Sequence, residues 1–542
     1  MTGTPFEAAD VDPTGLVERA TRLVSAGCGL IVTAALGDLA IRAAVRLETR
    51  WDELAYHLPF AALRGGLAIP YDMNDEMYPW YQGYPPLPHL LQGVLWRLTG
   101  SVNATGVVCY LAFLTFLIYC HLALRARFWL VALIALTAPM VLIHTTVSYI
   151  DLIGNSFLAI GFSSCLYLYL FPERPSRVIL LCGLAGLVGA AWSKYPMVPL
   201  VAVAFGLFAV IGLSRATTTG LSRRQTATLL LLAAVLAALP YLQNLYFYQN
   251  PFWPLRVPVA PDLFPYVVDT GNPDLPPPLQ EYGHVSLFIH SLFEIDHPTS
   301  YDDRPRWIID QGNAWIAFRS GGFWGAGVIF YLLAAAILLV AHDRKRGVVA
   351  CISLLGLLSF VAVLPQSYEL RYYLFIPLLW AAAIAMTFPR FRQAMPRAAL
   401  LFLLIALGLF AYMARENRMY YEISRIDYQA AAQKWGAPDY WANMQRGKTY
   451  CAVGMAPIGI LLTGPTMSEF TIFDRTREAL CPDDSTILTQ DGVQHRKGLG
   501  GDLPSHHAHQ PEGAAEEPAG GGMGTGASVV KSPELTDTHR GA

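Results

Sequence analysis

"PMVPLVAVAFGLFAVIGL", residues 196–213, contains no charged side chain. A helix needs about 20 consecutive apolar residues to cross a bilayer, so this stretch predicts a transmembrane helix. Lys194 stands just before the run and Arg215 just after it. Working outward from this stretch, the same alternation of apolar runs and short charged connections continues in both directions.

The composition agrees with that pattern. The chain has 542 residues, of which 54% are hydrophobic and 14% are charged, whereas an ordinary soluble domain has about 25% charged residues. We predict an all-α polytopic membrane protein with about eleven transmembrane helices. The net charge of −2 gives no electrostatic footprint for nucleic acid, so no nucleic-acid partner is expected. The apolar runs lie near residues 22–45, 104–123, 128–146, 151–170, 177–193, 196–213, 227–246, 323–341, 348–364, 372–388 and 398–414.

The connections between these runs differ in charge. Cytoplasmic loops of membrane proteins carry an excess of Lys and Arg, so the basic loops predict a cytoplasmic amino terminus and a carboxyl terminus outside. The alternate connections hold Arg125 and Arg127; Arg174 and Arg177; Arg215, Arg223 and Arg224; Arg344, Lys345 and Arg346; and Arg390, Arg392 and Arg397.

This orientation divides the chain into four parts. Residues 1–21 form a cytoplasmic amino terminus, and residues 22–414 form the transmembrane domain with long outer loops at 48–103 and 247–322. Residues 415–495 form a small outer segment. Residues 496–542, which are rich in Gly, Pro, His and Glu, are expected to be a disordered tail.

The first outer loop carries two stretches with helical apolar spacing, residues 51–66 and 87–100, and each ends at glycine. We expect amphipathic helices lying on the membrane surface. Between them "YPWYQGYPPLP", residues 78–88, is rich in aromatic and proline residues. Such rings suit a sugar or a lipid headgroup, and they equally suit an ordinary interfacial aromatic belt.

The outer segment near the carboxyl terminus reads as a small strand-helix-strand unit. "KTYCAVG", "APIGILL" and "EFTIFD" follow one another between residues 448 and 474, which is an α/β pattern. Cys451 and Cys481 flank this pattern. In an oxidising compartment they can pair, and the sequence leaves a disulfide and two free thiols both open.

Polar groups recur at the predicted outer ends of the apolar runs. Asp52 and Glu53 follow the first run, with Tyr56 and His57 one turn later. Asp151 begins the fourth run, which is also a common position for an acid that caps a helix dipole.

Three further polar positions lie on the same side. Lys194 sits in the short turn before residues 196–213, where snorkelling to the interface is the plain alternative. Asn244 ends the seventh run. Glu369 and Arg371 open the tenth, where a local ion pair is the alternative. Together the acids suit deprotonation of a hydroxyl or metal binding, and the cations suit a phosphate.

The order of these motifs resembles the GT-C superfamily of membrane glycosyltransferases, and among its members the bacterial aminoarabinose transferases and protein O-mannosyltransferase-like proteins. The resemblance spans residues 20–415. It is carried by the Asp-Glu pair after the first run, "YPPL", an acid opening the fourth run, the Lys-x-Pro turn, "NPFWP" and "RYYLFIP".

The resemblance implies a GT-C-like fold and a function in a bacterial inner membrane. A sugar on a polyprenyl phosphate would be transferred, with inversion, to a glycan, lipid or protein acceptor at the outer face. Membrane lipid and the lipid-linked sugar are the implied partners, and a divalent metal is a possible cofactor.

The same resemblance implies roles for single residues. Asp52 is implied as the base or a metal ligand, with Glu53 beside it and Asp151 as the second acid and alternative metal ligand. Lys194 and Arg371 are implied to approach the donor phosphate. The expected substrate-binding residues are Tyr56, His57, Tyr84, Asn244 and Glu369. The chain departs from some relatives at Tyr84, where they have Lys before Pro-Pro-Leu.

Two other functions compete with this reading. A transporter or flippase of lipid-linked precursors would place charges within the membrane, and Asp38, Arg42 and Arg46 in the first run are its best support. A local Asp38–Arg42 pair at i,i+4 is the simpler account of those charges. A scaffold of an envelope assembly complex would explain the helices and leave the outer acids without a role.

The predicted orientation can be tested by labelling intact cells with a membrane-impermeant thiol reagent. Single reporter cysteines placed at Asp52, in residues 247–322 and in the tail should react, because these regions are predicted to lie outside. A reporter at Arg223 should be protected. Labelling at Arg223 with protection of the other three would reverse the orientation.

Overall fold

The computed structural model describes most of the helical part of the chain and the strands near its carboxyl terminus. The described residues are 13–48, 52–67, 69, 72–73, 77–174, 176–214, 220–257, 263–268, 281–295, 306–309, 321–423, 425–427, 444–445, 447–453, 471–475, 481–482, 484–489 and 492–494. Residues 1–12 of the expected cytoplasmic segment 1–21, the expected tail and the "APIGILL" stretch lie outside them, whereas residues 13–21 belong to the first helix.

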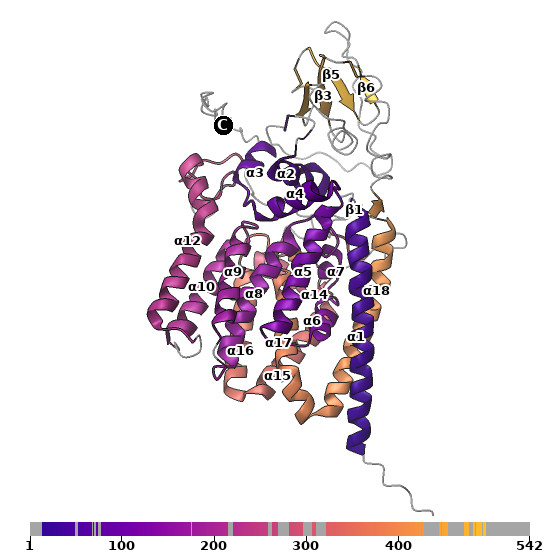
Figure 1. Ribbon diagram of the computed structural model, residues 1–542, viewed down its shortest axis with the longest axis vertical. Helices are drawn as coiled ribbons and strands as arrows, with labels where there is room; N and C mark the ends of the chain where they lie inside the picture. The colour runs from indigo at the N-terminus through magenta and orange to yellow at the C-terminus, as the bar shows by residue number, and fades with distance from the viewer. Residues whose placement is uncertain are drawn as a thin grey trace, which may run out of the picture. The chain divides into compact units, whose positions relative to one another are not determined.

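Within the described part of the chain, nine helices are long and apolar enough to cross a membrane, and the chain is an integral membrane protein. The predicted polytopic all-α architecture is confirmed (Figure 1). The nine candidate spans lie in α1 (Pro13–Val45), α5 (Ala104–Leu122), α8 (Asp151–Leu170), α10 (Met197–Ser214), α12 (Arg223–Tyr248), α15 (Gly325–His342), α16 (Arg344–Ala362), α17 (Phe375–Ala394) with the short η2 (Leu370–Tyr373) before it, and α18 (Pro396–Ile423).

Two of the eleven predicted runs form shorter helices. The run near 128–146 is broken into α6 (Phe128–Ala135) and α7 (Pro139–His144). Proline lacks an N–H and disfavours a helical residue before it, and Pro139 accordingly starts a new helix after the extended Ala138. The run near 177–193 gives α9 (Arg177–Ala191), which has 15 residues.

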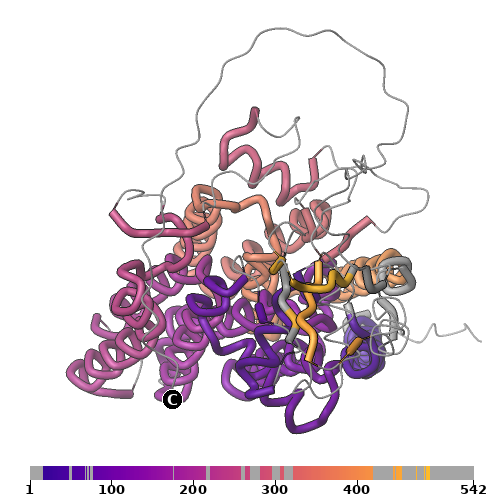
Figure 2. The backbone as a smooth tube through the Cα atoms, turned by 90° about the horizontal axis from the view of Figure 1, so that it is seen from above, coloured from indigo at the N-terminus to yellow at the C-terminus, as the bar shows by residue number. Residues whose placement is uncertain are grey.

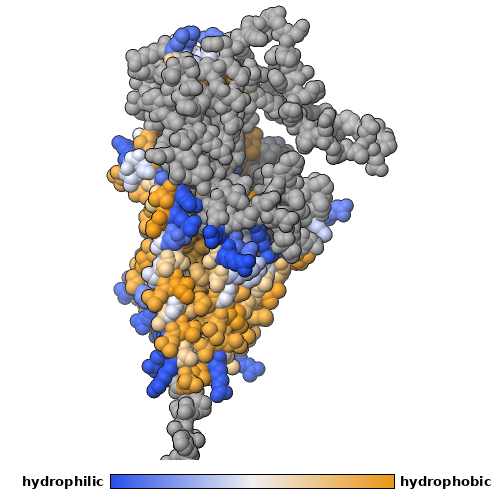
Figure 3. Space-filling view, turned by 90° about the vertical axis from the view of Figure 1, so that its right-hand side faces the viewer, coloured by the Kyte–Doolittle hydropathy of each residue, from blue (hydrophilic) through white to orange (hydrophobic). Residues whose placement is uncertain are grey.

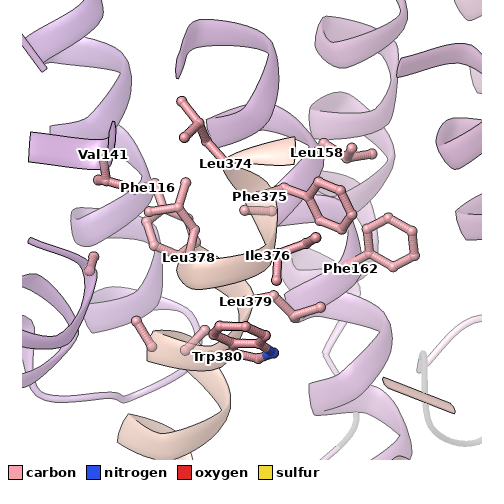
Figure 4. Packing of buried hydrophobic residues seen from close by; sticks show 14 of the residues in the cluster. Phe116, Val141, Leu158, Phe162, Leu374, Phe375, Ile376, Leu378, Leu379 and Trp380 are labelled. Atoms are coloured by element: carbon pink, nitrogen blue, oxygen red, sulfur yellow. The ribbon is translucent and has the colours of Figure 1, made fainter. Parts of the chain in front are cut away.

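The helices are arranged around α17. It packs against α15, α8, α6 and α18, and its Phe375, Leu378 and Trp380 side chains are buried (Figure 4). Seen along the helices, α10 and α12 lie at one edge of the bundle and α1 and α18 at the opposite edge (Figure 2). The outward faces of the helices are apolar, as Figure 3 shows for one side, which is what a lipid environment requires.

The loop that was predicted to be the first outer loop folds over one end of these helices (Figure 1). It holds the π-helix η1 (Glu53–His57), α2 (Leu58–Arg64), α3 (Met77–Gly83) and α4 (Leu87–Thr99). The second predicted amphipathic stretch is α4, which exposes Leu90, Val94 and Leu98 and ends at Gly100 with φ +68°. The first is different: residues 58–62 of α2 are all buried, so it is enclosed by protein.

Close packing of α2 against α4 depends on two glycines. A Cβ on Gly93 would lie 1.9 Å from the Ala61 carbonyl oxygen, and one on Gly65 would lie 2.4 Å from the Gly93 oxygen. The backbones therefore meet with no side chain between them. Since η1 leads directly into α2, this contact helps to fix the segment that begins at Asp52.

The loop that was predicted to be the second outer loop contains α14 (His284–Phe293), and hydrogen bonds at the end of this helix hold the described part of the loop in place. The Glu294 carboxylate after α14 accepts hydrogen bonds from Trp307 Nε1 at 2.8 Å, Gly322 N at 3.0 Å and Trp324 N at 2.9 Å. Ser291 Oγ donates to the Tyr368 carbonyl at 2.5 Å. These bonds connect the loop to the segment that carries Glu369 and Arg371.

Strands form two small sheets. β1 (Arg46–Glu48), after α1, pairs antiparallel with β2 (Arg425–Asp427), after α18. The sheet near the carboxyl terminus has the order β4-β3-β5-β6, with both neighbours of β3 parallel to it. Its strands are β3 (Thr449–Val453), β4 (Thr471–Arg475), β5 (Thr486–Thr489) and β6 (Gly492–Gln494).

The cysteines that flanked the predicted α/β unit are paired. Cys451 in β3 and Cys481 form a disulfide across a sequence separation of 30 residues. Of the two outcomes left open by the sequence, the structure has the disulfide. Both cysteines pack with Ile487 of β5, so the bond lies in the small core of this sheet.

The α2–α4 contact generates a stability prediction. Gly93→Ala forces the two backbones apart, and overpacking of this kind typically costs about 1–3 kcal/mol, so the melting temperature in detergent should fall. Gly356→Ala in α16 is the matched control, since nothing lies within 4 Å of its Cβ position. That variant should melt at or slightly above the wild-type temperature. Equal melting temperatures for both variants would contradict the packing argument.

Candidate active site

Asp52 and Arg371 meet although 319 residues separate them in the sequence. Arg371 Nη1 lies 3.1 Å from Asp52 Oδ2, and Arg371 Nε lies 3.1 Å from Glu369 Oε2. The predicted local Glu369–Arg371 pair is present, and a long-range pair is added to it. The Asp52 side chain is 24% exposed, whereas the Arg371 side chain is 7% exposed, so the carboxylate lies at the solvent edge of the pair.

Asp151 and Lys194 form a second, deeper pair. Lys194 Nζ lies 2.6 Å from Asp151 Oδ1, with side chains 9% and 0% exposed. Burial lowers the pKa of Lys194, and the Asp151 carboxylate opposes that shift. The Lys194 ammonium also lies 4.1 Å from the centre of the Tyr372 ring, and Tyr372 directly follows Arg371. The two ion pairs therefore meet at one aromatic side chain.

Glu53 is bound to the backbone that leads into α8. Its Oε2 accepts a hydrogen bond from Ser148 N at 3.0 Å. The Ser148 carbonyl accepts from Gln92 Nε2 of α4 at 2.6 Å, and the Ser148 hydroxyl lies 2.6 Å from that of Thr105. Glu53 thus ties the start of η1 to the residues just before Asp151, and so helps to hold Asp52 and Asp151 in a fixed relation.

Asn155, one turn after Asp151, connects α8 to α17. Its Nδ2 donates to the Asp151 carbonyl at 2.8 Å and to the Arg371 carbonyl at 3.4 Å, and its Oδ1 accepts from Phe375 N at 2.9 Å. One buried amide therefore fixes the backbone of an acid and of a cation in the site.

Two histidines, His57 at the end of η1 and His89 in α4, lie side by side. His57 Nδ1 and His89 Nε2 are 2.9 Å apart, and one of them donates to the other. Burial lowers the pKa of His89 to about 3 and holds the pKa of His57 well below its usual value. Both rings are therefore neutral near pH 7. Tyr56 packs on His57 and Tyr84 packs on His89, so these four side chains form one cluster of aromatic rings.

Asn244 bonds to the backbone just before the "YPPL" turn. Its Nδ2 donates to the Gly83 carbonyl at 2.9 Å. The Tyr195 hydroxyl donates to that same carbonyl at 2.5 Å and to the Trp253 carbonyl. These bonds connect the "YPPL" turn to α12 and to the turn that holds Lys194. Asn244 is a residue that positions the turn in this structure, and its predicted contact with substrate stays a prediction.

Metal binding by Asp52 or Asp151 also stays a prediction. Within the described residues, no group of three or more His, Cys, Asp or Glu side chains lies close enough together to hold a metal ion. Each of the two aspartates has a cation as its neighbour.

The sequence identified most of the charged residues of this site and missed the residues that hold them. Of the predicted residues, Asp52, Asp151, Lys194, Glu369 and Arg371 come together in two ion-pair clusters. The residues missed were Tyr372, Asn155, Ser148 and His89. Tyr372 directly follows Arg371, and Asn155 follows Asp151 by four residues, so adjacency and helical spacing were the available signals.

The buried Asp151–Lys194 pair generates a prediction about stability. Asp151→Asn leaves a buried ammonium without its carboxylate, and Lys194→Met leaves a buried carboxylate, each of which typically costs about 3–5 kcal/mol. The double variant removes both charges, so its loss of melting temperature in detergent should be well below the sum of the single losses. Additive losses would show that the pair contributes no coupling.

Comparison with known proteins found likenesses in structure alone. No protein-family model and no curated protein matches the sequence. The structure of ArnT from Cupriavidus metallidurans in the apo state is 12% identical with a TM-score of 0.49, and covers 84% of this chain and 87% of that chain. The structure of the same protein bound to undecaprenyl phosphate is 13% identical with a TM-score of 0.46, and covers 86% of this chain and 90% of that chain. Both TM-scores lie below 0.5, so the chemistry has to be argued from the side chains of this chain.

Proposed function

We propose that this protein transfers a sugar from a polyprenyl-phosphate donor to a hydroxyl acceptor at the outer face of a bacterial inner membrane. The observation that carries the proposal is the meeting of two acid–cation pairs, Asp52–Arg371 and Asp151–Lys194, at the end of the helices covered by α2 and α4. In the proposed reaction the phosphate of the donor binds these cations while its lipid tail stays in the bilayer.

The exposures of the two aspartates support different roles. The Asp151 side chain is 0% exposed and bonded to Lys194 at 2.6 Å, so its part is to hold the cation in place. The Asp52 side chain is 24% exposed and is open to an acceptor. Asp52 is therefore the proposed base, and Lys194 and Arg371 are the proposed contacts of the donor phosphate.

The proposed reaction is a single displacement. Asp52 takes the proton of the acceptor hydroxyl while the acceptor oxygen bonds to the anomeric carbon of the sugar. The bond from that carbon to the phosphate oxygen breaks on the opposite face, so the anomeric centre is inverted. The electron pair of the broken bond remains on the polyprenyl phosphate, whose negative charge the two cations stabilise.

The charges of the site also predict that an arriving phosphate competes with the carboxylates for the two cations. Asp52, Glu53, Asp151 and Glu369 outnumber Lys194 and Arg371 by two, so an arriving phosphate meets an excess of negative charge. Arg371 already binds Asp52 and Glu369. A phosphate that binds Arg371 Nη1 displaces the Asp52 carboxylate from that nitrogen. The carboxylate is then free to accept a proton. A divalent cation arriving with the donor would offset the remaining charge.

Two of the three charges that favoured a transporter, Asp38 and Arg42, form the local pair that was the simpler account of them. Arg42 Nε lies 2.6 Å from Asp38 Oδ2 within α1, and the side chains are 29% and 57% exposed. The pair is local and lies on the helix surface, away from the core of the bundle. The simple i,i+4 interpretation of these charges is confirmed.

The test uses Asp52→Asn, with Glu53→Gln as the adjacent control. In a strain that lacks the protein, mass spectrometry of lipid extracts should show a polyprenyl-phosphate sugar accumulating and its product missing. Asp52→Asn should fail to restore the product, because losing a general base costs about 10²–10⁴-fold in rate. It should bind the purified donor at least as tightly as the wild type, since the carboxylate no longer competes for Arg371.

Glu53→Gln should retain far more transfer, because the amide oxygen can still accept from Ser148 N. Near-normal transfer by Asp52→Asn would refute the mechanism. Unchanged lipid and glycan profiles in the deletion strain, with the donor moved across the membrane by the purified protein, would favour a transporter.

A further inference from the structure

Tyr372 touches both cations of the site through different parts of its side chain. Its ring centre lies 4.1 Å from Lys194 Nζ and 5.0 Å from Arg371 Cζ. Its hydroxyl accepts a hydrogen bond from Arg371 Nη2 at 3.1 Å. A cation within about 6 Å of a ring centre is attracted to the ring face, so the ring and the hydroxyl act on two positively charged groups at once.

The surroundings give the Tyr372 side chain little freedom. The residue is 9% exposed, and its backbone N–H donates to the Glu369 carbonyl at 3.0 Å within η2. Asn155 holds the residues on either side, through the Arg371 carbonyl and Phe375 N. The ring is thus a fixed surface against which two long, flexible side chains are placed.

The fixed ring of Tyr372 counteracts the repulsion between the two cations. Two cations that must contact one phosphate repel each other before it arrives, and the Arg371 charge lowers the pKa of Lys194. Their carboxylates lie on different elements: Asp151 holds Lys194, whereas Asp52 and Glu369 hold Arg371. Tyr372 contacts both cations, the ammonium through its ring and the guanidinium through its ring and its hydroxyl.

We propose that Tyr372 is a positioning residue that sets the separation of Lys194 and Arg371 and so builds the phosphate subsite. The ring anchors the ammonium, and the hydroxyl orients the guanidinium. This inference rests on the proposed function, because it takes a lipid phosphate as the ligand that bridges the two cations.

The two parts of the side chain can be separated by substitution. Tyr372→Phe keeps the ring and removes the hydroxyl, so the affinity for a polyprenyl monophosphate in nanodiscs should fall about threefold. Tyr372→Leu removes both, and the affinity should fall at least about tenfold. Tyr373→Phe is the matched control, because the hydroxyl of that neighbouring buried tyrosine donates to the Pro365 carbonyl, away from the shared contact with the cations.

The effect should depend on the phosphate and on the cations. Polyprenol, which lacks the phosphate, should bind all variants equally, whereas a general structural defect would weaken both ligands. In the Lys194→Met background, the difference between Tyr372→Leu and Tyr372→Phe should be smaller than in the wild type, because the ring then has no ammonium to hold and keeps only its contact with Arg371.

The outcomes separate the two proposals. A wild-type protein that binds polyprenyl phosphate no better than polyprenol would overturn the proposed function and this inference with it. A wild type that distinguishes them, with Tyr372→Phe and Tyr372→Leu both within twofold of it, would overturn the role of Tyr372 alone. If Tyr372→Leu does not fold, Tyr372→Phe and its Tyr373→Phe control decide the matter.

Discussion

Burial of charge is the constraint on which the site depends. A carboxylate or an ammonium taken out of water is costly unless an opposite charge and hydrogen bonds compensate it. Asp151, with a fully buried side chain, satisfies this through Lys194 at 2.6 Å. Lys194 lies in the turn before α10, so the pair locks the start of α8 to that turn. The positions of two helices are thereby tied to one electrostatic contact.

Further hydrogen bonds hold the neighbouring segments of the site in place. Glu53 connects η1 to Ser148, and Asn155 connects α8 to the backbone of Arg371 and Phe375. On the far side of the site, Ser291 joins α14 to Tyr368. Each of these bonds runs between segments that are distant in sequence. The site is consequently held by its neighbours as a unit, which is the condition for a preorganised electrostatic environment.

The sequence predicted the helices better than their contacts. Apolar runs are decided by local composition, so the helices of Figure 1 could be read from the chain, with Pro139 as the signal for the break that was missed. Contacts depend on how each helix is rotated about its axis, and composition does not specify that rotation. Arg371 illustrates the difference. Its partner Glu369 is two residues away and was foreseen as a local pair, whereas the Asp52 contact spans 319 residues.

The π-helical turn at Glu53–His57 has a consequence for how this site can vary. Leu58 N bonds to Glu53 O, five residues back, so the turn contains one residue more than an α-helix would hold. If the same residues adopted α-helical geometry, the extra residue would rotate everything before it by about 100° relative to α2. Asp52 would then turn away from Arg371. The wide turn therefore sets the direction in which the proposed base points, and a change that relaxed it to an α-helical turn would be expected to take Asp52 out of the site while leaving the other helices in place.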